Sequence, residues 1–229
     1  MSAGINLLFA ENLTVGYRPG FPIVSEVMLK IEAGATYALL GGNGVGKSTI
    51  FKTLTGLIPP LDGRIVKRES LAISYVPQSK KMRIDYPISV EDVLLMGRNL
   101  GLSFFPKRKF MPSEIDLLEQ TQVAPILKKH IAECSGGQLQ KVLILRSLFT
   151  SAHLLFLDEP MDSLDHSSRE LFQKILAEDR IQNKRAIFVI THNKENDWNS
   201  PFDEILEIDE GKLYHVSQGE LPPNCHHHE

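Results

Sequence analysis

The chain has 229 residues, of which 42% are hydrophobic and 23% are charged, and it contains 2 cysteines. This length allows one large domain, or one and a half average ones, with a core that needs neither disulfides nor a structural metal, which excludes the small cross-linked scaffolds. Because 25 Lys and Arg face 28 Asp and Glu, the formal net charge is −3, and we expect no nucleic-acid partner.

The apolar runs are short. The longest, at residues 154–157 and 186–190, span only a few positions, whereas a membrane-crossing helix needs roughly 18 or more. The apolar residues 7–10 follow no basic segment and are interrupted by Glu11, so we expect no secretory signal. These features predict a cytosolic chain with reduced thiols that does not cross a membrane by itself.

The first half of the chain predicts short strands around one helix. Strands are expected at residues 7–10, 27–31 and 36–40, then a helix over 48–56 and further strands near Val66 and at 71–76. From Ser89 to Phe149 apolar residues recur at helical spacing. This change of period indicates an inserted helical subdomain.

The second half returns to strands. Residues 154–157 and 186–190 are continuous apolar runs, which are typical of strands buried on both faces of a mostly parallel sheet. Segments 205–208 and 212–216 flank Asp209-Glu210-Gly211, a pattern that predicts a closing hairpin at the edge of the sheet. The predicted fold class is therefore α/β, with a mostly parallel sheet and a helical insertion.

A glycine-rich loop lies between the predicted strand at 36–40 and the helix that follows it. Glycines let successive backbone N–H groups point at a phosphate, the helix start adds its positive end, Lys47 adds a charge for the β and γ phosphates, and Ser48 can hold Mg²⁺. A glycine-rich turn that binds nothing is the alternative, and this full match in the expected context argues against it. The predicted phosphate loop comprises Gly41, Gly42, Asn43, Gly44, Val45, Gly46, Lys47 and Ser48, with Thr49 next.

Two acidic residues close the apolar run at 154–157. Asp158 can bind in the Mg²⁺ shell at the mouth of the sheet, and Glu159 can reach the water that attacks the γ phosphate. A solvated strand end with two charges is the alternative. The phosphate loop makes the catalytic interpretation the stronger one.

A second candidate anion site precedes the helical run 139–150. Ser135, Gly136, Gly137 and Gln138 stand where a helix N-cap and free backbone N–H groups are expected. A Ser-Gly-Gly start can equally be a plain capping device. One phosphate loop in one chain has no obvious need for a second anion site, unless that site completes a pocket on another copy.

Taken together, these motifs resemble the nucleotide-binding subunit of ATP-binding cassette (ABC) transporters. Residues 41–48 resemble the Walker A loop, 154–159 the Walker B strand and 134–138 the family signature, usually written Leu-Ser-Gly-Gly-Gln. Gly42 stands where many members have Pro, and Cys134 where most have Leu. Neither departure removes a backbone donor or a charged group, and Cys134 is expected to be a core thiol.

The resemblance also implies roles for scattered residues. Gln78 is similar to the Q-loop glutamine, which binds Mg²⁺ beside Ser48 and Asp158, and Ser163-Leu164-Asp165 is similar to the D-loop, with Asp165 reaching across a dimer. His192 is similar to the switch histidine that contacts the γ phosphate, and Tyr17 to the ring that stacks on adenine. Taken singly, Gln78 could be a plain turn residue, His192 a helix cap and Tyr17 a surface or core aromatic.

The resemblance further implies a P-loop NTPase core with an antiparallel β subdomain. The core would comprise residues 1–78 and 150–216, the helical subdomain with the signature 79–149, and a tail 217–229. Two copies would face head to tail with ATP between the loop of one and the signature of the other, and would part after hydrolysis.

The implied partners are a second copy, integral membrane permease subunits and, indirectly, an extracytoplasmic substrate-binding protein. The chain would then lie on the cytoplasmic face of the inner membrane as a peripheral subunit. A P-loop kinase would need no signature at residues 135–138. Cassette ATPases of chromosomes or ribosomes need a coiled coil or a second cassette, for which residues 78–134 leave no room.

The segment 86–98 resembles that of importers for zinc, manganese and related metal ions, with iron-chelate importers as near relatives. Core packing is the alternative reading of its apolar stripe. The tail Cys225-His226-His227-His228 has side chains that bind Zn²⁺, so it is either a metal sensor or the remnant of a purification tag or loose end.

Overall fold

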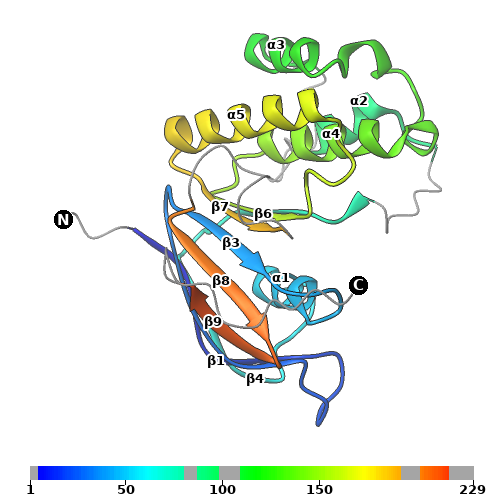
Figure 1. Cartoon of the computed structure of the whole chain (residues 1–229). Coiled ribbons are helices and arrows are strands. Elements are labelled where there is room, and N and C mark those ends of the chain that lie inside the picture. Colours follow the sequence, from blue (N-terminus) through cyan, green and yellow to red (C-terminus); the bar gives the residue numbers. More distant parts are fainter. Residues whose placement is uncertain (1–4, 80–86, 98–108, 192–201, 217–229) are drawn as a thin grey trace.

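The computed structural model describes residues 5–79, 87–97, 109–191 and 202–216. Within them the strands form one nine-stranded sheet, in the order β4-β1-β2-β9-β8-β3-β7-β6-β5. The helices lie on both sides of this sheet (Figure 1). The strands are β1 (Asn6–Val15), β2 (Val24–Glu32), β3 (Thr36–Leu40), β4 (Asp62–Lys67), β5 (Ile73–Val76), β6 (Leu154–Asp158), β7 (Ala186–Ile190), β8 (Glu204–Asp209) and β9 (Lys212–Val216).

The helical elements fall into two groups. One helix, α1 (Lys47–Thr55), directly follows β3, and it ends where Gly56 adopts the left-handed conformation. The others lie on the opposite side of the sheet (Figure 1). They are α2 (Val90–Met96), α3 (Pro112–Gln120), the short 3-10 turns η2 (Ala124–Ile126) and η3 (Ile131–Glu133), α4 (Gly136–Leu148) and α5 (His166–Asn183).

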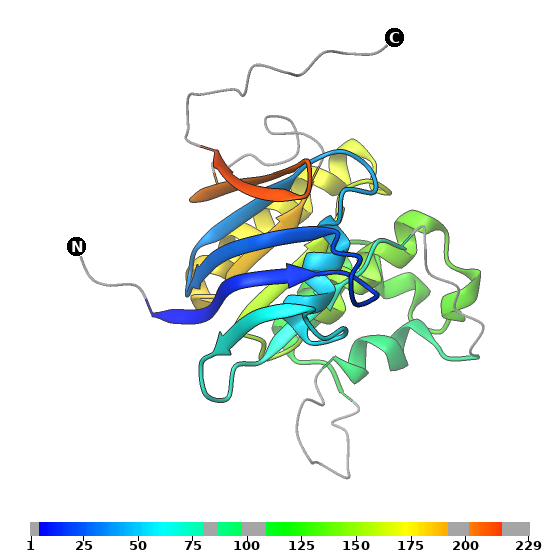
Figure 2. The same cartoon turned by 90° about the horizontal axis from the view of Figure 1, so that it is seen from below.

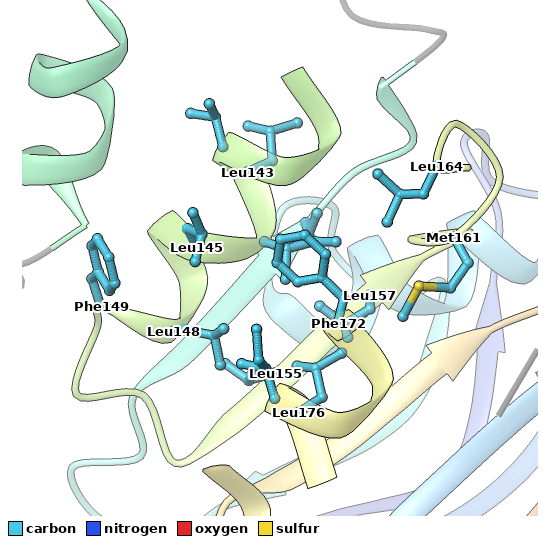
Figure 3. Packing of buried hydrophobic residues seen from close by; sticks show 14 of the residues in the cluster. Leu143, Leu145, Leu148, Phe149, Leu155, Leu157, Met161, Leu164, Phe172 and Leu176 are labelled. Carbon is cyan, nitrogen blue, oxygen red and sulfur yellow. The ribbon is translucent and has the colours of Figure 1, made fainter. Parts of the chain in front are cut away.

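Strands β5, β6, β7, β3 and β8 run parallel, and β3, β6 and β7 are buried at every position. Because side chains alternate along a strand, β6 sends Leu155 and Leu157 to one face and Leu154 and Phe156 to the other. The first pair packs under α4 and α5, as Figure 3 shows for the residues around Phe172. The second pair packs with α1. This two-sided burial is the physical reason for the continuous apolar runs, and it confirms the predicted sheet.

The antiparallel strands β1, β2 and β4 form the other end of the sheet and lie against α1 (Figure 2). Phe51 of α1 is completely buried between the two parts of the sheet and contacts the rings of Phe156 and Phe188 edge-on, with centroids 4.7 and 4.9 Å away. The aromatic cluster therefore fixes the helix that follows the glycine-rich loop. The mostly parallel sheet, with its antiparallel strands at one end and the helices on its other side, confirms the predicted fold class.

Most expected elements are present, with shifted bounds. The strand predicted at residues 7–10 extends through Val15, because irregular pairing at Asn12 (φ 47°) lets the strand continue. The β8–β9 hairpin is confirmed, and Glu210 and Gly211 have the positive φ values of a tight hairpin turn. Its predicted place was wrong: β9 pairs on its other side with β2, so the sheet ends at β4 and β5.

Two further observations concern the helices. Helix α5 was not among the sequence predictions, although Asp165 caps its start by accepting from the backbone N–H of Ser168 at 2.8 Å. In the part of the chain that the structure describes, no helix combines the length and the apolar character that crossing a bilayer requires.

Candidate functional site

The loop between β3 and α1 follows a backbone path that requires glycine. Gly41, Gly44 and Gly46 have φ of 138°, 81° and 112°, in the left-handed region. A Cβ at Gly46 would also lie 2.6 Å from Cγ2 of Ile23, so a side chain has no room there. Gly46 is the N-cap of α1 and provides no side-chain cap. The N–H groups of the first turn are therefore suited to an anionic ligand.

Lys47 places its ammonium group inside this loop. The residue is 6% exposed, and its Nζ donates to the carbonyl oxygens of Gly41 and Gly42, both at 2.7 Å. A buried ammonium surrounded by backbone N–H groups is the arrangement that binds a chain of phosphates. The loop therefore fits the phosphates of a nucleotide.

The two acidic residues lie beside the loop at the end of β6. Asp158 is 3% exposed and accepts a hydrogen bond at Oδ2 from the hydroxyl of Tyr75, at 3.2 Å. Glu159 is 8% exposed, with φ of 50°, and its backbone N–H donates to Ile190. A buried glutamate in this conformation costs about 1–3 kcal/mol in backbone strain. Such strain at the edge of a cavity supports a functional role.

Gln78 joins the end of β5 to the acidic pair. Its Nε2 donates to the carboxylate of Glu159. Its Oε1 is buried and has no hydrogen-bond partner among the described residues. This unpartnered amide oxygen shares the cavity wall with Asp158 and Ser48. The three side chains offer an all-oxygen set of the kind that Mg²⁺ prefers, so these residues fit a magnesium ion.

These residues surround one cavity of about 460 Å³ at the carboxyl ends of β3, β5 and β6. Parallel sheets bind ligands at this end, and the volume suits a small molecule. Predicted and unpredicted residues both contribute to its wall. It is lined by Tyr17, Ile23, Asn43, Gly44, Gly46, Lys47, Ser48, Thr49, Lys52, Tyr75, Pro77, Gln78, Asp158 and Glu159.

Tyr17 lies at the mouth of the cavity and is 59% exposed. Its hydroxyl is 3.5 Å from Oγ1 of Thr49 and 3.5 Å from Nζ of Lys52, and that ammonium also lies 5.9 Å from the centre of the ring. An aromatic ring at the mouth of such a cavity can stack on a base.

Ser135–Gln138 are not among the residues that line this cavity, as far as the structure describes the chain. Ser135 caps α4: its Oγ accepts from the N–H of Gln138 at 3.2 Å, while Oε1 of Gln138 accepts from the N–H of Ser135 at 3.1 Å. Ser135 and Gly136 are nonetheless exposed. The capping interpretation is therefore correct for this chain, and the same exposed helix start remains open to a ligand from outside.

The predicted D-loop, residues 163–165, lies near the start of α4. Ser163 places its Oγ 3.3 Å from that of Ser79, and a Cβ on Gly137 would lie 2.9 Å from its carbonyl oxygen. Asp165 is exposed. The hydrogen bond from the backbone of Ser168 lowers the pKa of Asp165, with further bonds from the side chains of Ser168 and Ser167.

Two sequence predictions lie outside the described residues: His192, and the cysteine and histidines of 225–228. Three further predicted residues, Gly41, Gly42 and Val45, belong to the phosphate loop but do not line the cavity. Gly41 and Gly42 instead supply the carbonyl oxygens that hold Lys47, and Val45 packs against the core.

Four lining residues were not predicted: Ile23, Lys52, Tyr75 and Pro77. Tyr75 had the clearest signal, because it lies in a short strand that ends two residues before Gln78. Burial, together with the nearby charge of Asp158, raises the pKa of Tyr75, so its hydroxyl keeps its proton.

Comparisons with known proteins agree with this geometry. The profile of the family described as ABC transporter matches residues 24–162. The manganese transport system ATP-binding protein MntB of Listeria monocytogenes is 34% identical over 213 residues, which are 90% of this chain and 88% of that protein. The zinc import ATP-binding protein ZnuC of Wigglesworthia glossinidia brevipalpis is 35% identical over 188 residues, which are 82% of this chain and 77% of that protein.

A solved structure shares the whole architecture. It shows a transporter assigned to the metal-chelate ABC type in an inward-facing conformation, and one of its chains matches this one with a TM-score of 0.75 and 26% identity. The match covers 93% of this chain and 84% of the other.

Proposed function

This chain belongs to the ABC transporter family as an ATP-binding subunit that hydrolyses ATP, and from this premise we propose that it powers the import of a metal ion, zinc or manganese. Subunits of this kind work with membrane permease subunits. The single observation that carries the ATP-dependent part of the proposal is the cavity in which the phosphate loop, Lys47, Gln78 and the acidic pair meet.

The binding step follows from the loop. The backbone N–H groups of residues 41–46 and the start of α1 bind the phosphates, and Lys47 turns its ammonium from the loop carbonyls toward the β and γ phosphates. Tyr17 stacks on the adenine ring. Ser48, Gln78 and Asp158 hold Mg²⁺, which when bound neutralises part of the charge on the phosphates.

Hydrolysis depends on Glu159. Its carboxylate orients the attacking water and receives the proton of that water, and Gln78, which already contacts it, holds it toward the cavity. The family resemblance assigns to His192 the contact with the γ phosphate. Burial of Glu159 at 8% exposure keeps other water away from the reacting oxygen.

Ser135–Gln138 complete the site of a second copy. Their exposed helix start does not line the cavity of its own chain in the described residues, and a head-to-tail dimer brings each one to the other chain's ATP. Ser163 lies beside this helix start, because a Cβ on Gly137 would be 2.9 Å from its carbonyl oxygen, and Asp165, two residues further on, contacts the partner. Residues 79–149 form the helical subdomain that carries this surface, between core segments 1–78 and 150–216, and 217–229 form the tail.

A mixing experiment tests the dimer. Lys47→Ala removes the phosphate contact and Ser135→Arg blocks the signature, so each variant alone should have less than about 5% of normal ATPase activity. In an equimolar mixture half of the dimers are mixed, and each mixed dimer has one site built from two intact halves. We expect about a quarter of normal phosphate release. A mixture no more active than its components would contradict the shared site.

The cargo is proposed from the relatives. The names of two relatives specify manganese transport and zinc import, and the matched structure is of the metal-chelate type. A chelated metal such as iron is therefore the second candidate. Selectivity resides in the permease, on which this chain acts as a peripheral subunit at the cytoplasmic face of the membrane, with an extracytoplasmic substrate-binding protein delivering the ion.

Transport measurements distinguish the candidates. The chain is purified together with its permease and reconstituted into vesicles with ATP on its own side. The substrate-binding protein is added on the opposite side with radioactive zinc, manganese or a ferric chelate. We expect ATP-dependent uptake of zinc or manganese. Uptake of the ferric chelate alone would support the second candidate, and no uptake of any of the three would contradict metal import.

A further inference from the structure

Tyr75 stands at a position from which one hydroxyl group can control the carboxylate of Asp158. β5 pairs in parallel with β6, and Tyr75 lies opposite Phe156. Because every second residue of a strand faces the same way, Tyr75, Phe156 and Asp158 share one face of the sheet. The step from Phe156 to Asp158 is about 6.6 Å, close to the length of a tyrosine side chain. The register therefore delivers the hydroxyl to the carboxylate.

The ring of Tyr75 is also held in place. Its edge meets Phe51 of α1, with ring centres 6.5 Å apart at 80°, and Phe51 is completely buried against Phe156. The hydroxyl then donates to Oδ2 of Asp158 at 3.2 Å, and both residues line the cavity. The contact thus joins the helix after the phosphate loop to the acidic end of β6.

We propose that Tyr75 is a positioning residue that sets the orientation of the Asp158 carboxylate for Mg²⁺. The terminal torsion of an aspartate is broad, so a carboxylate without a fixed partner presents its oxygens over a range of angles. A donor fixed by aromatic packing removes this freedom before the metal arrives. The inference rests on the proposed role of Asp158 in metal binding, and it assigns to Tyr75 a part in metal affinity and none in direct contact with ATP.

The test compares Tyr75→Phe with a matched loss of another buried hydroxyl. Tyr75→Phe keeps the ring against Phe51 and removes only the donor. Tyr37 is 3% exposed, its hydroxyl accepts from the N–H of Glu32 at 2.9 Å, and it lies outside the cavity wall, so Tyr37→Phe is the control. Free Mn²⁺ is titrated by electron paramagnetic resonance against each variant saturated with a non-hydrolysable ATP analogue.

We expect Tyr75→Phe to bind Mn²⁺ about three- to tenfold more weakly, which is the range of one ordinary hydrogen bond. Binding of a fluorescent ATP analogue without metal should not change, and neither should Mn²⁺ binding by Tyr37→Phe. Unchanged Mn²⁺ affinity in Tyr75→Phe would overturn the inference. So would an equal loss of metal-free nucleotide binding, because that would indicate a general collapse of the pocket.

Asp158→Asn separates this inference from the proposed function. It should weaken Mn²⁺ binding by more than about tenfold, because it removes the charge that the metal contacts. If Asp158→Asn weakens binding and Tyr75→Phe does not, Tyr75 has no positioning role while the metal site stands. If Asp158→Asn also binds Mn²⁺ normally, the metal site itself is wrong.

Discussion

Replacing Glu159 by Gln should lower ATP hydrolysis at least about 100-fold while ATP binding stays within about threefold of normal. The amide has nearly the shape of the carboxylate, but it cannot take a proton from the attacking water. Glutamine also keeps the side-chain size at a residue whose backbone φ is 50°, so the strained turn after β6 is disturbed as little as possible. Phosphate release measures turnover, and isothermal titration measures binding.

The control for Glu159→Gln is Glu170→Gln. Glu170 lies on α5, its side chain is 60% exposed, and its partner is His166 at 3.7 Å, so the same chemical change occurs outside the cavity wall. Its turnover should remain within about twofold of normal, since a surface ion pair contributes little. Turnover above a tenth of normal in Glu159→Gln would assign the proton transfer to another group.

The parts of the site that sequence reasoning located are those in which neighbouring residues form one local unit. The loop of residues 41–48 combines strand end, glycines and helix start in one continuous stretch, and the acids at 158 and 159 directly end an apolar strand. Their chemistry depends on backbone geometry that these residues impose themselves. For this reason seven residues of these two units line the cavity, whereas Tyr17 and Gln78 were located only through the family resemblance.

The contacts that sequence reasoning missed depend on pairing between distant strands. Tyr75 reaches Asp158 only because β5 and β6 are neighbours in one register, and 83 positions separate the two residues. The place of the β8–β9 hairpin depends likewise on Ser25 of β2, which pairs with Lys212. Period and composition determine which face of a strand is apolar, whereas neighbours in a sheet are set by the whole chain.

Replacing Lys47 by Ala should raise the dissociation constant for ATP at least about 100-fold, equivalent to roughly 3 kcal/mol. The ammonium of Lys47 is a buried positive charge inside the loop, where the carbonyls of Gly41 and Gly42 hold it at 2.7 Å, so binding needs only a turn of a side chain that is already ordered. Loss of a buried charge-assisted contact with phosphate affects affinity more than loss of an exposed one.

Lys52 supplies the matched control for this prediction because it belongs to the same helix and the same cavity wall. Its ammonium lies beside Tyr17, at 3.5 Å from the hydroxyl, and not inside the loop. Lys52→Ala removes an equal charge from the cavity together with its contact to Tyr17, so it sets an upper limit on the general attraction of the site for an anion, which we expect to be worth less than about threefold in affinity. Equal losses in the two variants would show that net charge attracts the nucleotide. A far larger loss in Lys47→Ala would show that the position of one ammonium within the loop determines binding.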